Sequence, residues 1–219
     1  MEYKKTEKNK VKRGAAKSSY DKGVIHSVLD ATEICSIAFI HEGQAIVQPV
    51  NFGRSGEYIY LHGSLKNRMT NALIESGKVC LNVMLLDTMK ISRSAFHHSV
   101  NYRSAVVFGS VKELKTDKEK LKGLKSIINH FIPNRWDHCR LPDQKELNAT
   151  RVLEIRIETA SAKIAGGPVN DTNKDKESNY WAGYIPVKTF YGNPVPAEDL
   201  KKDIEIPQHI LDFYKKRKN

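Results

Sequence analysis

Residues 92–111 read Ser-Arg-Ser-Ala-Phe-His-His-Ser-Val-Asn-Tyr-Arg-Ser-Ala-Val-Val-Phe-Gly-Ser-Val and join a polar, basic entrance to an apolar strand. From Ala105 onward, β-branched and aromatic residues are typical of a buried strand, and Gly109 indicates a bulge or a close backbone approach. Seven hydrogen-bonding side chains come before that strand: Arg93, His97, His98, Asn101, Tyr102, Arg103 and Ser104. They predict a pocket for a polar, anionic ligand; the simpler alternative is two exposed histidines before an ordinary strand.

The segments on either side predict a mainly β fold with inserted helices. Apolar and alternating runs predict strands at 34–40, 45–52, 57–62, 79–86, 102–114 and 151–159. Helical spacing predicts helices at 64–76, with Ser64 as N-cap, at 117–131 and at 207–216. Because short turns dominate the connections, we expect a closed or nearly closed antiparallel barrel rather than parallel crossover units.

Length and composition indicate one domain. The chain has 219 residues, 40% of them hydrophobic, which suffices for one core. Residues 1–17 are polar and aperiodic and are expected to be a disordered basic tail, with 18–219 as a single domain and a C-terminal extension from about 187. There is no secretory signal pattern, no long apolar run and no Cys-x-x-Cys pair, so a cytoplasmic location is expected.

The net charge of +11 is concentrated near the two ends of the chain. Residues 1–17 carry seven basic side chains against two glutamates, and residues 215–218 add four more basic side chains. The central part is therefore nearly neutral, whereas a nucleic-acid-binding face needs a basic stripe on the folded domain. We expect solvated tails, no specific nucleic-acid partner and no membrane partner.

Several sequence motifs of enzymes and metal sites are missing. The chain has no dinucleotide-binding Gly-x-Gly-x-x-Gly, no phosphate-binding Gly-x-x-x-x-Gly-Lys-Ser/Thr and no Gly-x-Ser-x-Gly. His97 and His98 are adjacent, and adjacent residues of an extended chain point in opposite directions. No metal site is expected.

A second basic stretch, His62-Gly63-Ser64-Leu65-Lys66-Asn67-Arg68, lies where a predicted strand passes into a predicted helix. Free amide groups and the helix dipole favour an anion at such a point, and arginine can grip phosphate with two parallel bonds. The alternative is a solvated helix start with two surface cations. Whether this stretch and Tyr102-Arg103-Ser104 share one phosphate is left open by the sequence.

Several of these motifs together resemble the pyridoxamine 5′-phosphate oxidase-related flavoproteins, in the branch near the nitroimidazole-resistance flavoproteins. The resemblance covers about residues 18–186 and rests on four stretches: Tyr-Leu-His-Gly-Ser at 60–64, Ser-Ala-Phe-His-His-Ser-Val-Asn-Tyr-Arg-Ser at 94–104, Phe-Gly at 108–109 and Ser-Ala-Lys at 161–163. It implies a split β-barrel homodimer that binds flavin mononucleotide (FMN) at the subunit interface.

The resemblance also implies which residues hold the flavin. Arg68 matches the family's basic residue for the phosphate, and Pro49, Val50 and Asn51 match backbone that faces the flavin ring. The remaining expected contacts come from the two basic stretches and from the C-terminal part: His62, Gly63, Ser64, Lys66, Asn67, Tyr102, Arg103, Ser104, Lys163 and Trp181. The substrate motif of the oxidase proper is missing from 195–219, so oxidation of vitamin B6 is not expected.

Two functions remain open at this point. The first is an FMN-dependent oxidoreductase that takes electrons from NAD(P)H and reduces a small-molecule acceptor, with His97, His98 or Tyr102 as candidate proton donors. The second is a non-catalytic protein of the same fold that binds flavin or haem.

Overall fold

The computed structural model describes residues 1–218 and contains one antiparallel sheet of nine strands. The strands are β1 (Ser18–Ser19), β2 (Ile34–His41), β3 (Gln44–Asn51), β4 (Gly53–Ser55), β5 (Tyr58–Ser64), β6 (Lys78–Ile91), β7 (Ser99–Leu114), β8 (Thr150–Ala165) and β9 (Gly183–Pro186). The α-helices are α1 (Lys22–Leu29), α2 (Arg68–Ser76), α3 (Asp117–Phe131), α4 (Gln144–Ala149), α5 (Asn173–Lys176) and α6 (Gln208–Arg217). Three short 3₁₀ turns cover Ala15–Lys17, Ala95–His97 and Arg135–His138.

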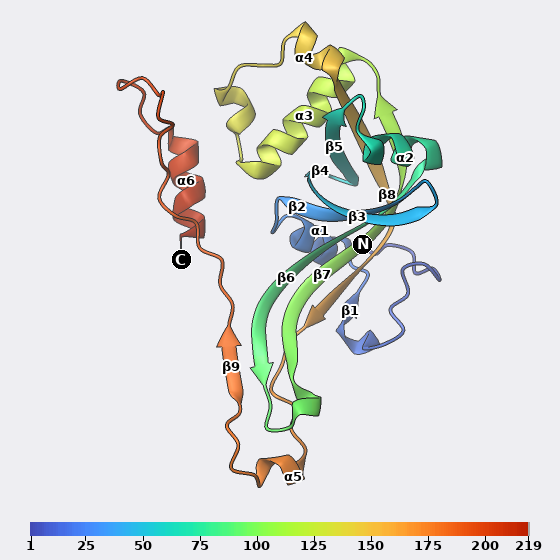
Figure 1. Cartoon of the computed structure of the whole chain (residues 1–219), viewed down its shortest axis with the longest axis vertical. Helices are drawn as coiled ribbons and strands as arrows, with labels where there is room; N and C mark the ends of the chain where they lie inside the picture. The colour runs from blue at the N-terminus through green and yellow to red at the C-terminus, as the bar shows by residue number, and fades with distance from the viewer. Residues whose placement is uncertain (219) are drawn as a thin grey trace.

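The strand order is β3-β2-β6-β7-β8-β5-β4, with β1 added to β8 and β9 added to β6. Figure 1 shows long, curved β6, β7 and β8 running through the whole body, with α2, α3 and α4 at one end and α5 at the other. The predicted class, a split β-barrel with inserted helices, is confirmed. The sequence predicts a strand at 79–86 that 89–92 extends or restarts after a polar break at Asp87; the structure shows one strand, β6, which passes Asp87 through a bulge between Leu86 and Thr88.

Two apolar clusters hold the barrel together. The larger one fills the barrel between α1, α2 and the strands, and includes the fully buried Ile37, Leu61 and Leu153. The smaller one lies under α3 and joins Tyr60, Leu114, Ile127 and Val152. Since β5 alternates between these clusters, neither of its faces is free along Ile59–Leu61.

Helix α2 begins three residues later than the sequence predicts. Strand β5 continues through Ser64, and Asn67 is the N-cap, its side chain accepting a bond from the Thr70 amide at 3.2 Å. The turn between them is closed by Asn67 N–H donating to the Ser64 carbonyl at 3.1 Å. Ser64 as N-cap is therefore wrong, because pairing of β5 with β8 extends to Ser64↔Thr150.

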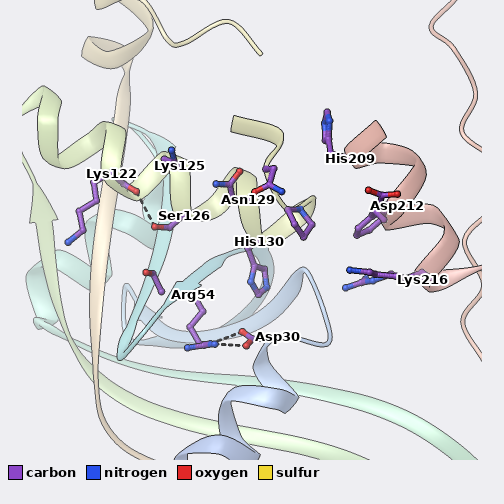
Figure 2. A pocket seen from close by; sticks show the side chains of 15 residues that line it. Asp30, Arg54, Lys122, Lys125, Ser126, Asn129, His130, His209, Asp212 and Lys216 are labelled. Carbon is purple, nitrogen blue, oxygen red and sulfur yellow. Dashed lines mark hydrogen bonds and ion pairs between the residues drawn. The ribbon is translucent and has the colours of Figure 1, made fainter. Parts of the chain in front are cut away.

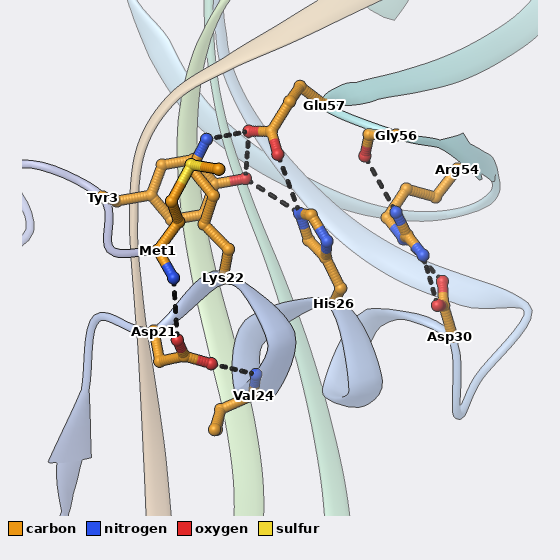
Figure 3. A network of polar contacts seen from close by, with 10 residues as sticks. All are labelled: Met1, Tyr3, Asp21, Lys22, Val24, His26, Asp30, Arg54, Gly56 and Glu57. Atoms are coloured by element: carbon orange, nitrogen blue, oxygen red, sulfur yellow. Dashed lines mark hydrogen bonds and ion pairs between the residues drawn. The ribbon is translucent and has the colours of Figure 1, made fainter.

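Residues 1–17 pack on the domain, so the prediction of a disordered tail is corrected. Tyr3 belongs to the main apolar cluster, and its hydroxyl donates to Glu57 Oε2 at 2.8 Å and lies 2.9 Å from His26 Nε2 (Figure 3). Buried Asn9 donates from Nδ2 to the Ala160 carbonyl at 3.0 Å. Single anchors of this kind create no periodic pattern, which is why the sequence does not reveal them.

From Val187 the chain leaves the sheet and runs as an extended arm to α6 (Figure 1). Helix α6 has no buried residue. It is tied to the body by Arg217, which forms an ion pair with Glu33 and donates to the Tyr191 hydroxyl at 2.7 Å. The basic run 215–218 therefore lies at the end of a helix that contacts the body. The charge pattern had predicted a free, solvated tail here, and that prediction is wrong.

Candidate functional site

One face of the sheet is left open by the rest of the described chain. The register places Ala38, Val47 and Cys80 side by side, and Asn82 and Met84 follow Cys80 on the same side of β6. Large apolar side chains on this face are exposed: Ile40 at 61%, Val47 at 68% and Met84 at 60%. A continuous apolar sheet face is uncommon on a monomer and marks an interaction surface.

Most of the strand residues predicted to touch flavin lie on this open face. Pro49 pairs with Ser36, in the same row as Asn82. Ser104 pairs with both Met84 and Lys163, and the alternation of β7 puts Tyr102 on the same side as Ser104. Val50 has the opposite orientation and packs against the core, so only its backbone is available to a ligand.

Backbone amide and carbonyl groups at the C-terminal ends of β3 and β5 are unpaired on one side in the described chain. Strands β4 and β5 pair from Ser55↔Tyr58 to Gly53↔Tyr60, and the described ladder ends there. If the β4–β5 register continued, Asn51 would lie opposite His62. Asn51 instead pairs only with β2, and His62 pairs only with β8, so their facing backbone groups are unpaired in the described chain. Amide and carbonyl groups at such an edge suit the hydrogen-bonding rim of a planar heterocycle.

The N-terminus of α2 lies directly beyond this edge. Asn67 caps the Thr70 amide, and the amides of Arg68 and Met69 have no partner within residues 1–218. Arg68 is exposed and forms no ion pair in the described chain, and the same holds for Lys66. Free amides, the helix dipole and exposed cations all favour an anion at this position.

Gly63 lies next to the N-terminus of α2, where a side chain would crowd the helix cap. A Cβ there would lie 3.3 Å from both Asn67 Nδ2 and Thr70 Cγ2, tighter than most real Cβ contacts. The missing side chain therefore protects the cap of α2 and keeps the backbone approachable. Neighbouring His62 is exposed at its edge, but the surrounding protein partly desolvates its ring and lowers the pKa of His62.

Arg151 is a contributor that the sequence did not reveal. Its guanidinium bonds the Leu65 carbonyl at 3.1 Å and the Asn71 side chain, while Nε forms a 2.9 Å ion pair with Glu113. It thereby fixes the loop before α2 to strands β7 and β8. The only signal in the sequence was a charged residue in an alternating strand, which is ordinarily a solvated position.

Arg103 is not a second phosphate site of the same kind. Its guanidinium forms bonds of 2.8–3.2 Å with the Asp87 carboxylate, which holds the pKa of Arg103 above its usual value. Arg103 pairs with Ile164 of β8, whereas Gly63, next to α2, pairs with Arg151 of the same strand. Ile164 and Arg151 are thirteen residues apart along β8. Within one chain, the two predicted basic stretches therefore cannot share a phosphate.

The remaining predicted residues lie at the far end of the β6–β7 ribbon. His97 is 3.9 Å from Asp175 of α5, and His98 Nδ1 is 3.0 Å from the Ser94 carbonyl. Trp181 is 67% exposed and packs against Gly183 next to β9. The structure does not bring any of the three to α2 of its own chain. Within the described residues no group of three or more potential ligands could hold a metal ion, and no helix could cross a membrane.

We expect the protein to lose stability as the pH falls from 7 to 5.5. Burial lowers the pKa of His26, His62 and His209, so the unfolded chain takes up protons first, near pH 6.5, and the free energy of unfolding decreases. Urea denaturation at several pH values measures this. Replacing His26 by glutamine should make the dependence shallower; a pH-independent free energy over this range would contradict the assignment.

The antiparallel split barrel places this chain in a fold class, and the comparisons with known proteins identify the family within it. The family model described as pyridoxamine 5′-phosphate oxidase matches residues 21–164, and the chain belongs to this family. No protein matches in the search of curated proteins.

Three solved structures resemble this chain. The flavocytochrome Anf3 from Azotobacter vinelandii is 32% identical, with a TM-score of 0.88 over 94% of this chain and 96% of that chain. The FAD and haem binding protein from Mycobacterium smegmatis is 31% identical, with a TM-score of 0.84 over 90% of this chain and 96% of that one. A protein assigned to 5-nitroimidazole antibiotic resistance, from Bacteroides thetaiotaomicron, is 22% identical with a TM-score of 0.58 over 67% and 86% and supports the fold alone.

Proposed function

We propose that this protein is a redox protein that binds a flavin nucleotide and, as a second cofactor, haem. The observation that carries the proposal is the match over nearly the whole chain to two proteins described as a flavocytochrome and as an FAD and haem binding protein. Flavin and haem both transfer electrons, and the protein supplies their binding and orientation.

Residues of this chain are placed where they could bind both the phosphate and the ring of a flavin nucleotide. The α2 N-terminus, with the free amides of Arg68 and Met69, would hold a phosphate, and the edges of Pro49–Asn51 and His62–Ser64 would meet the ring. The phosphate next to the ribityl chain is common to FMN and FAD. The sequence predicted FMN; chromatography of the flavin released from the purified protein identifies which form is present.

The open sheet face supports a homodimer with flavin at the interface. Pro49, Ser104 and Lys163 lie on this face together with exposed Val47 and Met84. A second copy of the chain would cover the apolar part and contribute to each flavin site. The Tyr102–Ser104 entrance, which is far from α2 of its own chain, is then available to the partner.

The proposed electron flow starts at NAD(P)H and passes through the flavin to a small-molecule acceptor. One test is anaerobic mixing of the flavin-loaded protein with NADH and, separately, with NADPH. Bleaching of the flavin absorbance at a rate well above that of free flavin supports this donor. Absence of bleaching with both would leave a flavin-binding protein with another electron source.

Replacing Arg68 by alanine is expected to weaken flavin nucleotide binding about tenfold to a hundredfold, because one charge-assisted bond contributes about 1.5–3 kcal/mol. Riboflavin, which has no phosphate, should be bound equally by both proteins. Fluorescence titration of the apoprotein with FMN, FAD and riboflavin measures this.

Lys78 provides a matched control, since it is an exposed cation at the other end of α2. Lys78→Ala should leave all three affinities unchanged. An unchanged nucleotide affinity in Arg68→Ala would show that the phosphate lies elsewhere. A parallel loss for riboflavin would indicate damage to the ring site instead.

A further inference from the structure

A large hollow lies between α3 and α6. It has a volume of about 810 Å³, and β4, the end of α1 and the residues that follow α3 complete its wall (Figure 2). Pockets of this size hold small-molecule ligands. The hollow adjoins Ser55 of β4, which pairs with Tyr58 at the start of β5. Helix α2 follows Ser64 at the other end of β5, roughly 20 Å along the strand, so the hollow is distinct from the proposed flavin phosphate position.

Charged and polar side chains make up most of this wall. Pro133 and Phe213 are the apolar side chains among its lining residues. The basic side chains outnumber the acidic ones by five to two: Arg54, Lys122, Lys125, Lys216 and Arg217 against Asp30 and Asp212. The wall therefore suits a polar ligand, and an excess of one sign of charge in a concave site favours a ligand of the opposite sign.

Three of the five cations already have a carboxylate as partner. The pairs are Arg54 with Asp30, Lys125 with Asp137 and Arg217 with Glu33. Lys122 and Lys216 form no ion pair within residues 1–218. Asp212 also has no cation as partner there, and it accepts a bond from Gln208 Nε2 at 2.7 Å. The charges that remain to interact with a ligand are thus two cations and one carboxylate.

The groups that are free to bind a ligand are mainly hydrogen-bond donors. Lys216 is exposed and extends from α6 into the hollow (Figure 2). Asn129 of α3 accepts the Trp136 amide with Oδ1 at 2.9 Å, so its Nδ2 is left to donate elsewhere. Arg217 uses Nη1 for its hydrogen bonds within the described chain, which leaves Nε and Nη2. Because these donors come from both helices, a ligand that accepts from all of them would bridge α3 and α6.

Phosphate groups match this set of donors. Phosphate oxygens accept charge-assisted bonds from ammonium, guanidinium and amide groups. A single inorganic ion would fill a small part of about 810 Å³, whereas a nucleotide has the size that such pockets enclose. The Phe213 ring and Pro133 provide an apolar part of the wall for a sugar or a base.

We propose that the hollow binds a small phosphorylated molecule with the size and charge of a nucleoside diphosphate. Lys216 and Lys122 neutralise its phosphates, and Asn129 Nδ2 and Arg217 donate to the phosphate oxygens. The ligand contacts both helices, so it ties α6, which has no buried residue of its own, more firmly to the body. This site is additional to the proposed function and does not depend on it.

The test is isothermal titration calorimetry of full-length, flavin-loaded protein with ADP, AMP and adenosine. ADP is expected to bind more tightly than AMP, and adenosine not to bind, because affinity follows negative charge. Added salt should weaken ADP binding. Flavin absorbance of the same samples shows whether flavin stays bound; its release by ADP would place ADP in the flavin site and overturn the inference. Protein that holds no flavin but binds ADP would refute the proposed function and leave this site standing.

Three variants change the hollow in opposite directions. Lys216→Ala and Asn129→Asp are each expected to weaken ADP binding about tenfold or more, as the loss of one charge-assisted bond. Asn129→Asp retains the oxygen that accepts the Trp136 amide and replaces Nδ2 by an anionic oxygen. Asp212→Asn removes the unpaired carboxylate, keeps an oxygen for Gln208 and should strengthen ADP binding several-fold.

Lys215→Ala and Asn148→Asp are the matched controls, since Lys215 lies on α6, Asn148 lies on α4 and neither lines the hollow. Both should bind ADP as the parent does. Unchanged ADP binding in Lys216→Ala and Asp212→Asn would overturn the site, as would equal losses in the controls or a parent protein that does not bind ADP. If circular dichroism shows that Asn129→Asp is misfolded, the two variants on the exposed face of α6 decide.

Discussion

Alanine in place of Gly53 is expected to lower the free energy of unfolding by about 3 kcal/mol or more. Gly53 begins β4 and is buried under α3. A Cβ at this position would lie 2.5 Å from both the Ile127 nitrogen and its Cα. Since these are backbone atoms, the clash cannot be relieved by turning a side chain, and α3 must move away from Tyr60 and Val152.

Urea denaturation followed by circular dichroism measures this loss. Gly166→Ala is the control, because a Cβ there meets nothing within 4 Å and the residue has no positive φ. The control should unfold as the parent does. A Gly53→Ala protein with unchanged stability would mean that α3 does not lie against β4 as described.

Glutamate in place of Val47 is expected to convert the protein to a monomer and to reduce flavin affinity more than a hundredfold. Val47 is 68% exposed in the single chain and lies on the open apolar face, on the edge strand β3. In the proposed homodimer that side chain would be buried, and an unpaired buried charge costs several kcal/mol. Flavin is lost with the dimer if both chains contribute to each site.

Val195→Glu is the matched control, since Val195 is 87% exposed in the arm between β9 and α6 and is not part of the open sheet face. Light scattering gives the mass, and fluorescence titration gives the flavin affinity. A Val47→Glu protein that stays dimeric contradicts the location of the interface. A monomer that keeps full flavin affinity contradicts the shared site.

The sequence was most informative where local chemistry decides the structure. Thr116 forms a complete capping box with Glu119 at the start of α3, where the sequence predicts a helix from 117. Glu42 and Gly43 adopt positive φ in the turn between β2 and β3. The motifs that carry the family resemblance correctly indicated the fold, and Arg68 is exposed at the first residue of α2.

The sequence was least informative where the outcome depends on distant neighbours. Arg103 looked like a free cation, but strand register brings it beside Asp87 on β6. Tyr3 looked like part of a disordered tail, but its hydroxyl donates to Glu57 and lies 2.9 Å from His26 Nε2.

The most direct test of the central claim is native mass spectrometry of the protein reconstituted with flavin nucleotide. We expect a species of two chains with two flavins. The Val47→Glu variant should give monomers without flavin, and Arg68→Ala should give a dimer with a reduced share of bound flavin. A single chain that retains its flavin, or a dimer that never takes up flavin, would contradict the account.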